Sequence, residues 1–249
     1  MADAPLVTVA VPSRNHASYL GRTLESIFAQ GVPVEVYVAD AASTDGTREV
    51  IREWEPRLLG WRSHADAGQA AAVNEGVARG SAPYVCWVNS DDWLLEGGLR
   101  RLVEALEAHR EAPFAYGRAW NFVEGRDRMR AVFVRPFSAR WMAQLNIVAQ
   151  PATLVRRSAW EAVGGLDERL HLAMDYDLWW RLYARFGAPC FVEAFVAVNR
   201  EHGGTKTATR RREHYREAMD VVRRHYGRVP LKWWLFQPYA VWYRGLIGR

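Results

Sequence analysis

Cysteine is scarce in this chain, with two residues, Cys86 and Cys190, among 249. Each lies in an apolar run, Y-V-C-W-V and P-C-F-V, and they do not have the spacing of metal ligands. A cysteine-based metal site is therefore excluded. We predict that both thiols are inert core residues of buried strands.

The chain also lacks a long uninterrupted apolar run. The apolar segment at 230–249 is interrupted by Gln237 and Pro238 and is too short to span a membrane comfortably. The start, M-A-D-A-P-L-V-T-V-A-V, runs directly into a predicted strand without the features of a signal peptide. We therefore expect a cytoplasmic protein.

Charge is unevenly distributed in an otherwise ordinary globular composition. Hydrophobic residues make up 49% and charged residues 24%, and the length suits one α/β domain with an appendage. Residues 200–249 contain 12 Lys and Arg against 4 Asp and Glu, so they carry +8 while residues 1–199 carry −3. Such a basic tail favours a polyanionic neighbour, either phospholipid or nucleic acid.

Apolar periodicity alternates between strands and helices, which predicts an open, mostly parallel α/β sheet. A strand-rich, irregular stretch follows at 114–136, and a turn at Gly164-Gly165 divides a helical region at 159–186. The remaining predicted strands are 7–12, 34–40, 83–88 and 191–198, and the remaining predicted helices are 18–30, 48–54, 69–79, 97–109 and 207–225.

Two carboxylates follow predicted strands. Asp40 ends one strand, and Asp91 lies in the N-S-D-D turn after another, 51 positions later. Because functional groups gather at the carboxyl ends of strands in open sheets, both acids should converge at one edge. Asp40 could accept a hydrogen bond from a nucleobase or ribose, and Asp91 with Asn89 and Asp92 could hold a hard cation. Taken alone, N-S-D-D also fits a capping turn.

Other nucleotide-binding classes fit less well. P-S-R-N follows the first strand where a dinucleotide-dependent oxidoreductase would carry G-x-G-x-x-G. The acids at the strand ends would repel phosphate, which argues against a nucleic acid as partner.

Five motifs occur in order within residues 5–205. They are P-S-R-N, V-A-D-A-A-S-T-D-G-T, D-A-G-Q-A-A-A-V-N-E-G, W-V-N-S-D-D-W and V-G-G-L-D-E-R-L-H-L-A-M-D-Y-D-L-W-W-R-L. Together they resemble the family 2 inverting glycosyltransferases. The resemblance implies a GT-A fold, a Rossmann-like and mostly parallel sheet flanked by helices, over residues 1–205. Residues 1–95 would form the nucleotide-binding half, 96–205 the acceptor half, and 206–249 a basic, aromatic helical extension.

The resemblance implies a nucleotide-diphosphate sugar as donor, expected to be a UDP-sugar. Asp91 matches the last acid of the D-x-D metal motif and would bind the donor diphosphate through Mn²⁺ or Mg²⁺. His202 lies where many relatives carry a histidine near the diphosphate, beside glycines and Lys206 that suit phosphate; a plain surface turn is the alternative. Nucleotide contacts are expected from Pro12, Arg14, Asn15, Asp40, Asp66, Gln69, Asn74, Asn89 and Ser90.

Asp175 matches the acid of the E-D motif that serves the family as general base. The deprotonated acceptor oxygen would then attack the anomeric carbon from the face opposite the phosphate and invert its configuration. Two departures concern this machinery. Met174 replaces the glutamate before the base, which keeps Asp177 as a second candidate. Asn89 replaces the first acid of D-x-D, so we expect weaker or more selective metal binding.

Four further residues are weaker candidates for contact with the donor or acceptor sugar: Asp92, Trp93, Gln150 and Trp179. Adjacent tryptophans on a helix usually mean that at least one packs in the core, so packing is the favoured interpretation of the aromatic candidates.

The C-terminal segment has two interpretations. Its aromatic and aliphatic residues follow the arginine-rich R-R-R-E-H-Y-R, as in a segment that lies at the inner face of a membrane. Alternatively, it forms a helical hairpin that packs on the catalytic domain or on a second subunit of a homodimer.

The expected function is metal-assisted, inverting transfer of a sugar to a hydroxyl of a glycan or lipid-linked acceptor, in the synthesis of surface glycan, polysaccharide or glycolipid. The alternative is a non-catalytic nucleotide-sugar-binding protein of the same fold, because Asn89 and Met174 replace usual acids.

Overall fold

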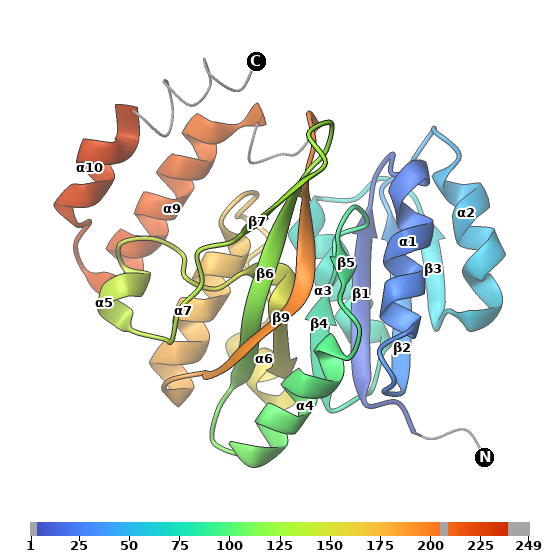
Figure 1. Ribbon diagram of the computed structural model, residues 1–249, viewed down its shortest axis with the longest axis horizontal. Coiled ribbons are helices and arrows are strands. Elements are labelled where there is room, and N and C mark those ends of the chain that lie inside the picture. The colour runs from blue at the N-terminus through green and yellow to red at the C-terminus, as the bar shows by residue number, and fades with distance from the viewer. Residues whose placement is uncertain (1–3, 205–208, 239–249) are drawn as a thin grey trace.

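A computed structural model describes residues 4–204 and 209–238 (Figure 1). The nine strands of these residues form one sheet in the order β3-β2-β1-β4-β8-β6-β9-β5, and β7 pairs with β6. The strands are β1 (Val7–Ser13), β2 (Val34–Asp40), β3 (Gly60–Ser63), β4 (Tyr84–Trp87), β5 (Trp93–Leu94), β6 (Phe114–Val123), β7 (Arg128–Ala131), β8 (Thr153–Arg156) and β9 (Cys190–Glu201).

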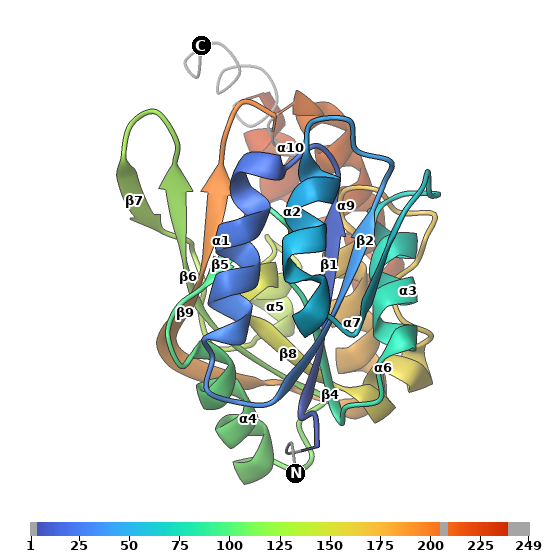
Figure 2. The ribbon, with the colours of Figure 1, turned by 90° about the vertical axis from the view of Figure 1, so that its right-hand side faces the viewer.

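The N-terminal part of the sheet is parallel and covered on both faces. β1 pairs with β2 and β4, and β2 pairs with β3, all in parallel. Every residue of β1 is buried, as expected of a strand between two helical layers. Figure 2 shows α1 and α2 on one face and α3 on the other. These helices are α1 (Ala17–Phe28), α2 (Thr47–Trp54, followed by the 3₁₀ turn Glu55–Arg57) and α3 (Gln69–Arg79).

The second part of the sheet adds antiparallel strands to the predicted parallel arrangement. β8 lies antiparallel between β4 and β6, and β5 is antiparallel to β9, whereas β6 runs parallel to β9. The sheet is therefore mixed. The flanking elements are α4 (Gly98–Ala108), α5 (Ala139–Met142), the 3₁₀ turn Gln150–Ala152, α6 (Arg157–Val163) and α7 (Met174–Phe186).

Aromatic side chains fill the core beside β4. Trp179 has no exposed surface and stacks on Trp87 at 5.9 Å and on Phe114 at 4.8 Å between ring centres. Cys86 is buried, which raises the pKa of its thiol to about 12, so its predicted inert role is confirmed. Cys190 is half-buried at the start of β9, which corrects the prediction of a core position.

Two helices of the predicted C-terminal extension, α9 (Arg211–Tyr226) and α10 (Leu231–Pro238), pack on residues of the 96–205 half. α9 lies against α7, where the His225 ring stacks on Trp180 and Val221 and Val222 are fully buried. Trp233 anchors α10 by donating its indole N–H to the carbonyl of Ala143 at 2.8 Å. Among the described residues, no helix combines the length and apolarity needed to cross a bilayer.

Candidate active site

The carboxyl ends of β1, β2 and β4 meet at one edge of the sheet, as predicted. The last residues of β1 and β2 lie opposite each other in the parallel register. The loop after β1 contacts the loops after both neighbours. The backbone N–H of Asn15 donates to Ser43 Oγ at 2.7 Å, and His16 Nδ1 lies 2.7 Å from Ser90 Oγ. The three loops are thus hydrogen-bonded to one another at the edge of the sheet where the nucleotide and metal sites are predicted.

Asn89 organises the turn after β4. Its Nδ2 donates to Asp92 Oδ2 at 3.0 Å and to Gln150 Oε1 at 3.2 Å, and its Oδ1 accepts a hydrogen bond from Gln69 Nε2 at 2.6 Å. Gln150 in turn donates to the carbonyl of Trp87 at 2.8 Å. Both ends of the Asn89 amide therefore hold the turn together, and Gln69 and Gln150 act as its supports.

Arg200 fixes the acidic half of the turn from β9. Its backbone N–H donates to Asp92 Oδ1 at 2.8 Å, and its Nε donates to the carbonyl of Asp91 at 3.0 Å. Its guanidinium lies 4.6 Å from the ring centre of Tyr19 and 4.9 Å from that of Trp93. Burial, with the charge of Asp91, raises the pKa of Asp92. Asp92 and Trp93 are both buried, which favours packing over the weaker prediction that they contact a sugar.

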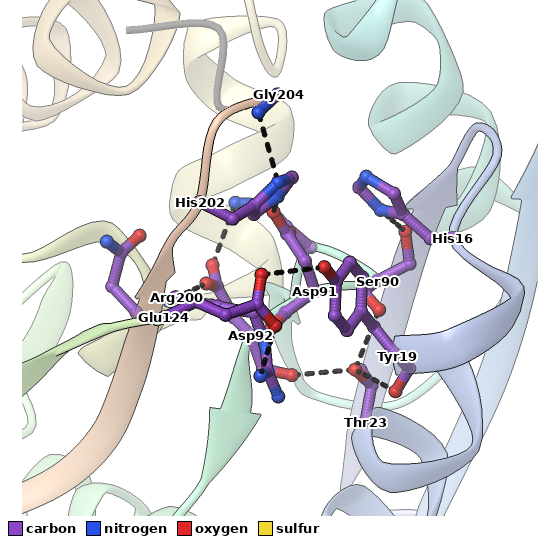
Figure 3. Close-up of polar contacts among 12 residues, drawn as sticks. His16, Tyr19, Thr23, Ser90, Asp91, Asp92, Glu124, Arg200, His202 and Gly204 are labelled. Atoms are coloured by element: carbon purple, nitrogen blue, oxygen red, sulfur yellow. Dashed lines mark hydrogen bonds and ion pairs between the residues drawn. The ribbon is translucent and has the colours of Figure 1, made fainter. Parts of the chain in front are cut away.

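Asp91 and two histidines form a candidate cation site. Oδ2 of Asp91 lies 3.0 Å from His202 Nε2, and one ligand atom each from His16, Asp91 and His202 lie within 4.8 Å of one another. Figure 3 shows the two rings facing the carboxylate from opposite elements, the loop before α1 and the end of β9. Gly204 N donates to His202 Nδ1 at 3.2 Å, whereas the predicted phosphate contact of Lys206 lies outside the described residues.

The P-S-R-N loop presents its last two residues to solvent. Pro12 is buried within β1, whereas Arg14 and Asn15 are exposed. Asn15 has a left-handed backbone with φ of 53°, which asparagine tolerates better than most residues. Its Oδ1 accepts the backbone N–H of Thr44 at 2.9 Å. Asn15 therefore sets the loop, and Arg14 is the exposed cation beside it.

Asp40 is fully buried at the end of β2. Its carboxylate accepts hydrogen bonds from the N–H of Ser43 at 3.0 Å, from the Ser43 hydroxyl, and from Ser63 Oγ at 2.5 Å. Arg62 donates to the carbonyl of Asp40 at 2.8 Å and to Asp66 Oδ2 at 2.9 Å. Contact of Asp40 with a nucleobase stays a prediction, and it requires one serine hydroxyl to turn away.

Asn74 joins α3 to the loop after α6. Its Nδ2 donates to the carbonyl of Leu166 and to Glu168 Oε1, both at 3.0 Å, and its Oδ1 accepts the N–H of Leu166 at 2.9 Å. These contacts support a structural role in place of the predicted donor contact.

Asp175 lies in the first turn of α7, partly buried, where Asn146 Nδ2 donates to its Oδ2 at 3.0 Å. Burial raises the pKa of Asp175 to about 6, against the opposing effect of backbone N–H groups and of Asn146. A carboxylate with this pKa is ionised at neutral pH and remains basic enough to take a proton, which suits a general base.

The burial and ion pairs of Asp177 favour a structural role over that of the second candidate base, which stays a prediction. It is 1% exposed and contacts Arg181 Nε at 2.7 Å, His225 Nε2 at 2.8 Å and Arg224 Nη1 at 3.2 Å. Burial alone would raise the pKa of Asp177, but the hydrogen bonds from His225 and Arg181 outweigh it, so the pKa is lowered. Its role is to tie α7 to α9. Trp179 has no exposed surface, which agrees with the favoured interpretation that it packs in the core.

Residues 8–164 match the sequence profile of Glycosyl transferase family 2. The chain belongs to this family. The glycosyltransferase is 29% identical to an uncharacterized glycosyltransferase of Mycobacterium tuberculosis. The alignment has 181 residues and covers 71% of this chain and 68% of the relative. It is 26% identical over 182 residues to the chondroitin synthase of Pasteurella multocida, which covers 72% of this chain but 19% of that protein.

Solved structures share the GT-A fold of this glycosyltransferase. Staphylococcus aureus TarS 1–349 in complex with UDP-GlcNAc superposes with a TM-score of 0.71 at 18% identity, over 88% of this chain and 66% of that one. The mannosyltransferase PcManGT of Pyrobaculum calidifontis, in complex with GDP-Man and Mn²⁺, superposes with a TM-score of 0.66 at 22% identity. This superposition covers 87% of this chain and 64% of that one. At these identities the likeness establishes the fold.

Four residues of the glycosyltransferase site were not predicted: His16, Arg200, Asn146 and Glu217. His16 directly follows P-S-R-N and Arg200 lies two residues before His202, so both could have been found by examining every polar residue beside those motifs. Glu217 of α9 accepts the backbone N–H groups of Leu172 at 2.8 Å and Ala173 at 3.0 Å. It thereby caps the α7 turn that carries Asp175, and nothing in the sequence motifs indicates this contact.

Proposed function

We propose that this family 2 glycosyltransferase moves a sugar, with inversion, from a UDP-sugar to an acceptor hydroxyl in the synthesis of a surface glycan, polysaccharide or glycolipid. The observation that carries this proposal is Asp175, a partly buried carboxylate with a pKa of about 6 that Asn146 orients. A protein that only bound nucleotide-sugars would have no use for a carboxylate tuned in this way.

Asp175 would act on the acceptor. Its ionised carboxylate takes the proton of the acceptor hydroxyl while that oxygen bonds to the anomeric carbon, from the face opposite the leaving group. The bond from the anomeric carbon to the diphosphate oxygen breaks, and its electron pair leaves with the nucleoside diphosphate. Asn146 keeps Oδ2 of Asp175 oriented by its 3.0 Å hydrogen bond.

A divalent cation, Mn²⁺ or Mg²⁺, fits the residues at the end of β4. Asp91 offers a carboxylate oxygen, which both ions accept, and His202 offers an imidazole nitrogen 3.0 Å from it, which suits Mn²⁺ better than Mg²⁺. When bound, the cation would supply electrostatic stabilisation of the diphosphate that leaves. The exposed Arg14 would add a positive charge for the same phosphates.

The acceptor side is proposed to meet an anionic membrane surface. Four large side chains of α10 are each more than half exposed: Leu231, Trp234, Leu235 and Phe236. Beside them, Arg140 and Arg228 line a hollow of about 340 Å³, which suits the phosphate of a lipid headgroup. An apolar face flanked by arginines is typical of an interfacial helix and fits a lipid-linked acceptor.

Vesicle co-sedimentation tests this contact. We expect binding to vesicles with anionic lipid, weaker binding to neutral vesicles, and loss of binding in a Trp234→Ser/Leu235→Ser variant. If the chain instead ignores vesicles and light scattering shows a dimer that the same variant dissociates, α10 is a subunit interface.

Calorimetric titration tests the donor and the metal. UDP, dTDP and GDP are titrated with and without Mn²⁺ into the wild type and into Asp91→Ala. We expect metal-dependent binding of UDP that the substitution abolishes. In a separate turnover assay, the product should have the anomeric configuration opposite to that of the donor. Binding without turnover of any UDP-sugar would favour the non-catalytic alternative, and absence of all nucleotide binding would contradict both.

A further inference from the structure

The missing acid of the D-x-D motif leaves the cation site without an expected ligand. Asn89 occupies that position, but its Oδ1 accepts the Gln69 hydrogen bond at 2.6 Å while its Nδ2 donates to Asp92 and Gln150. Turning this oxygen toward a cation would break hydrogen bonds that hold the turn. A third protein ligand, in addition to Asp91 and His202, would therefore come from a residue other than Asn89.

We propose that His16 takes the place of the missing acid as a third ligand, so that His16, Asp91 and His202 form a site selective for a transition-type cation such as Mn²⁺ over Mg²⁺. This proposal rests on the metal-assisted function above. The two histidine rings lie 5.8 Å apart between centres at 78°, and the three ligand atoms already lie within 4.8 Å of one another. Small rotations of the three side chains, which Figure 3 shows close together, would bring these atoms to one ion.

Neighbouring contacts set the orientation of His16. Its backbone N–H donates to Thr47 Oγ1 at 3.1 Å, and its Nδ1 lies 2.7 Å from Ser90 Oγ. Ser90 is buried and its carbonyl accepts the Thr23 hydroxyl at 3.0 Å, so this anchor is itself fixed. If Nδ1–H donates to Ser90, the lone pair of the ring lies on Nε2. A carbonyl or hydroxyl partner on one ring nitrogen is the usual way in which a protein orients a histidine ligand.

His202 must change its tautomer to bind. Its Nδ1 accepts the Gly204 N–H at 3.2 Å, which places the ring proton on Nε2, toward Asp91. As the cation binds, this proton moves to Nδ1, and the Gly204 amide turns away. The pair Gly203-Gly204 makes such a turn of the backbone inexpensive, because glycine adopts conformations that other residues avoid.

The donor set determines the choice of ion. Mg²⁺ prefers oxygen ligands in a near-ideal octahedron, whereas imidazole suits first-row transition ions. Two imidazoles and one carboxylate therefore favour Mn²⁺, and each histidine that is removed should reduce this preference. The site would select Mn²⁺ over Mg²⁺ because the first acid of D-x-D is missing and the imidazole of His16 takes its place as a ligand.

Electron paramagnetic resonance of Mn²⁺ bound to the full chain tests the ligand set directly, since electron spin-echo modulation detects coordinated imidazole nitrogen. The spectra are recorded without nucleotide and with UDP, for the wild type, His16→Gln and His202→Gln. His109→Gln, which changes a histidine near the start of β9, is the matched control. Circular dichroism and thermal unfolding verify that each variant folds.

We expect two imidazole couplings in the wild type and in His109→Gln, and one in each of the other variants. His16→Gln should weaken Mn²⁺ binding at least about tenfold, with a smaller change for Mg²⁺ measured by competition. One coupling in the wild type that His16→Gln retains and His202→Gln removes would overturn the proposal and leave the metal-assisted function intact. Two couplings without any nucleotide binding would instead leave the site standing and contradict the function.

Discussion

Replacing Asp175 by asparagine should strongly slow turnover and stabilise the fold above pH 6. In the folded chain the pKa of Asp175 is raised from 3.8 to about 6, chiefly by burial. At about 1.4 kcal/mol per pH unit, a shift of about two units limits the effect to about 3 kcal/mol. Because the carboxylate is partly exposed, we expect about 1–2 kcal/mol in practice. The asparagine oxygen can still accept the Asn146 hydrogen bond, so the geometry is conserved.

The direction of this change in stability follows from the linkage between proton binding and folding. Below pH 3.8 the carboxyl is protonated in both the folded and the unfolded chain and contributes nothing. As pH rises toward 6 the unfolded chain ionises first, so the wild type loses stability over this window and then stays level, whereas Asp175→Asn does not. Urea unfolding at pH 4.5, 6 and 7.5 measures this difference. A constant difference across these pH values would refute a raised pKa.

The activity of the same variant is the second part of this prediction. Loss of a general base should lower kcat by about 10² to 10⁴. In the wild type, kcat/KM should fall tenfold per pH unit below about pH 6, where Asp175 becomes protonated. Binding of UDP should be unchanged, since Asp175 is assigned to the acceptor. A wild-type profile that is flat down to pH 5 would refute the assignment of Asp175 as the base.

Three further substitutions test the supports of the site. Asp177→Asn should destabilise the fold by about 3–5 kcal/mol, because it leaves the cations that surround this buried carboxylate without their counter-charge; urea unfolding measures it, and a neutral result would contradict a structural role. Glu217→Ala should cost about 1–2 kcal/mol through loss of the cap on α7, with a shift of the acidic limb of the pH profile if the cap also orients Asp175. Arg200→Gln should weaken Mn²⁺ binding about tenfold by loosening the carbonyl of Asp91, and unchanged affinity would assign Arg200 to packing alone.

Most of the parallel half of the fold could be predicted, because its longer elements show a period and β4 lies in an uninterrupted apolar run, whereas the four-residue β3 was missed. The strands at 7–12 and 34–40 and the helix at 69–79 agree with β1, β2 and α3 to within a residue. β5 has two residues and β8 has four, too few to distinguish a strand from a loop. Because β8 enters antiparallel between β4 and β6, missing it also hid the change of strand direction.

The candidate site also contains residues that the sequence could predict and residues that it could not. Asp91, His202 and Asp175 lie in or beside recognisable motifs, and the structure gives each a chemically suitable setting. Asp177 shares a motif with Asp175 but is buried, since residues two positions apart on a helix point to different sides and sequence alone does not say which side is buried. The contact of Glu217 with the start of α7 depends on tertiary packing across 45 positions, which no local pattern encodes.

The boundary predicted at residue 205 can be tested by truncation. α9 caps α7 through Glu217 and contacts Asp177 through His225, while Met219, Val221 and Val222 are buried in the hydrophobic core. Burying these three side chains is worth about 1.5–3 kcal/mol each, which is comparable with the whole stability of a typical domain.

A chain that ends at residue 205 should therefore be insoluble or lack cooperative unfolding, whereas one that ends at Pro238 should fold and bind UDP as the full chain does. A truncated chain of 205 residues that unfolds cooperatively and retains Mn²⁺-dependent UDP binding would show that the predicted boundary is a true domain limit. In that case α9 would support only the acceptor side. Failure of the shorter chain alone would make α9 part of the catalytic domain, with the base held in place by a helix that lies outside the family's motifs.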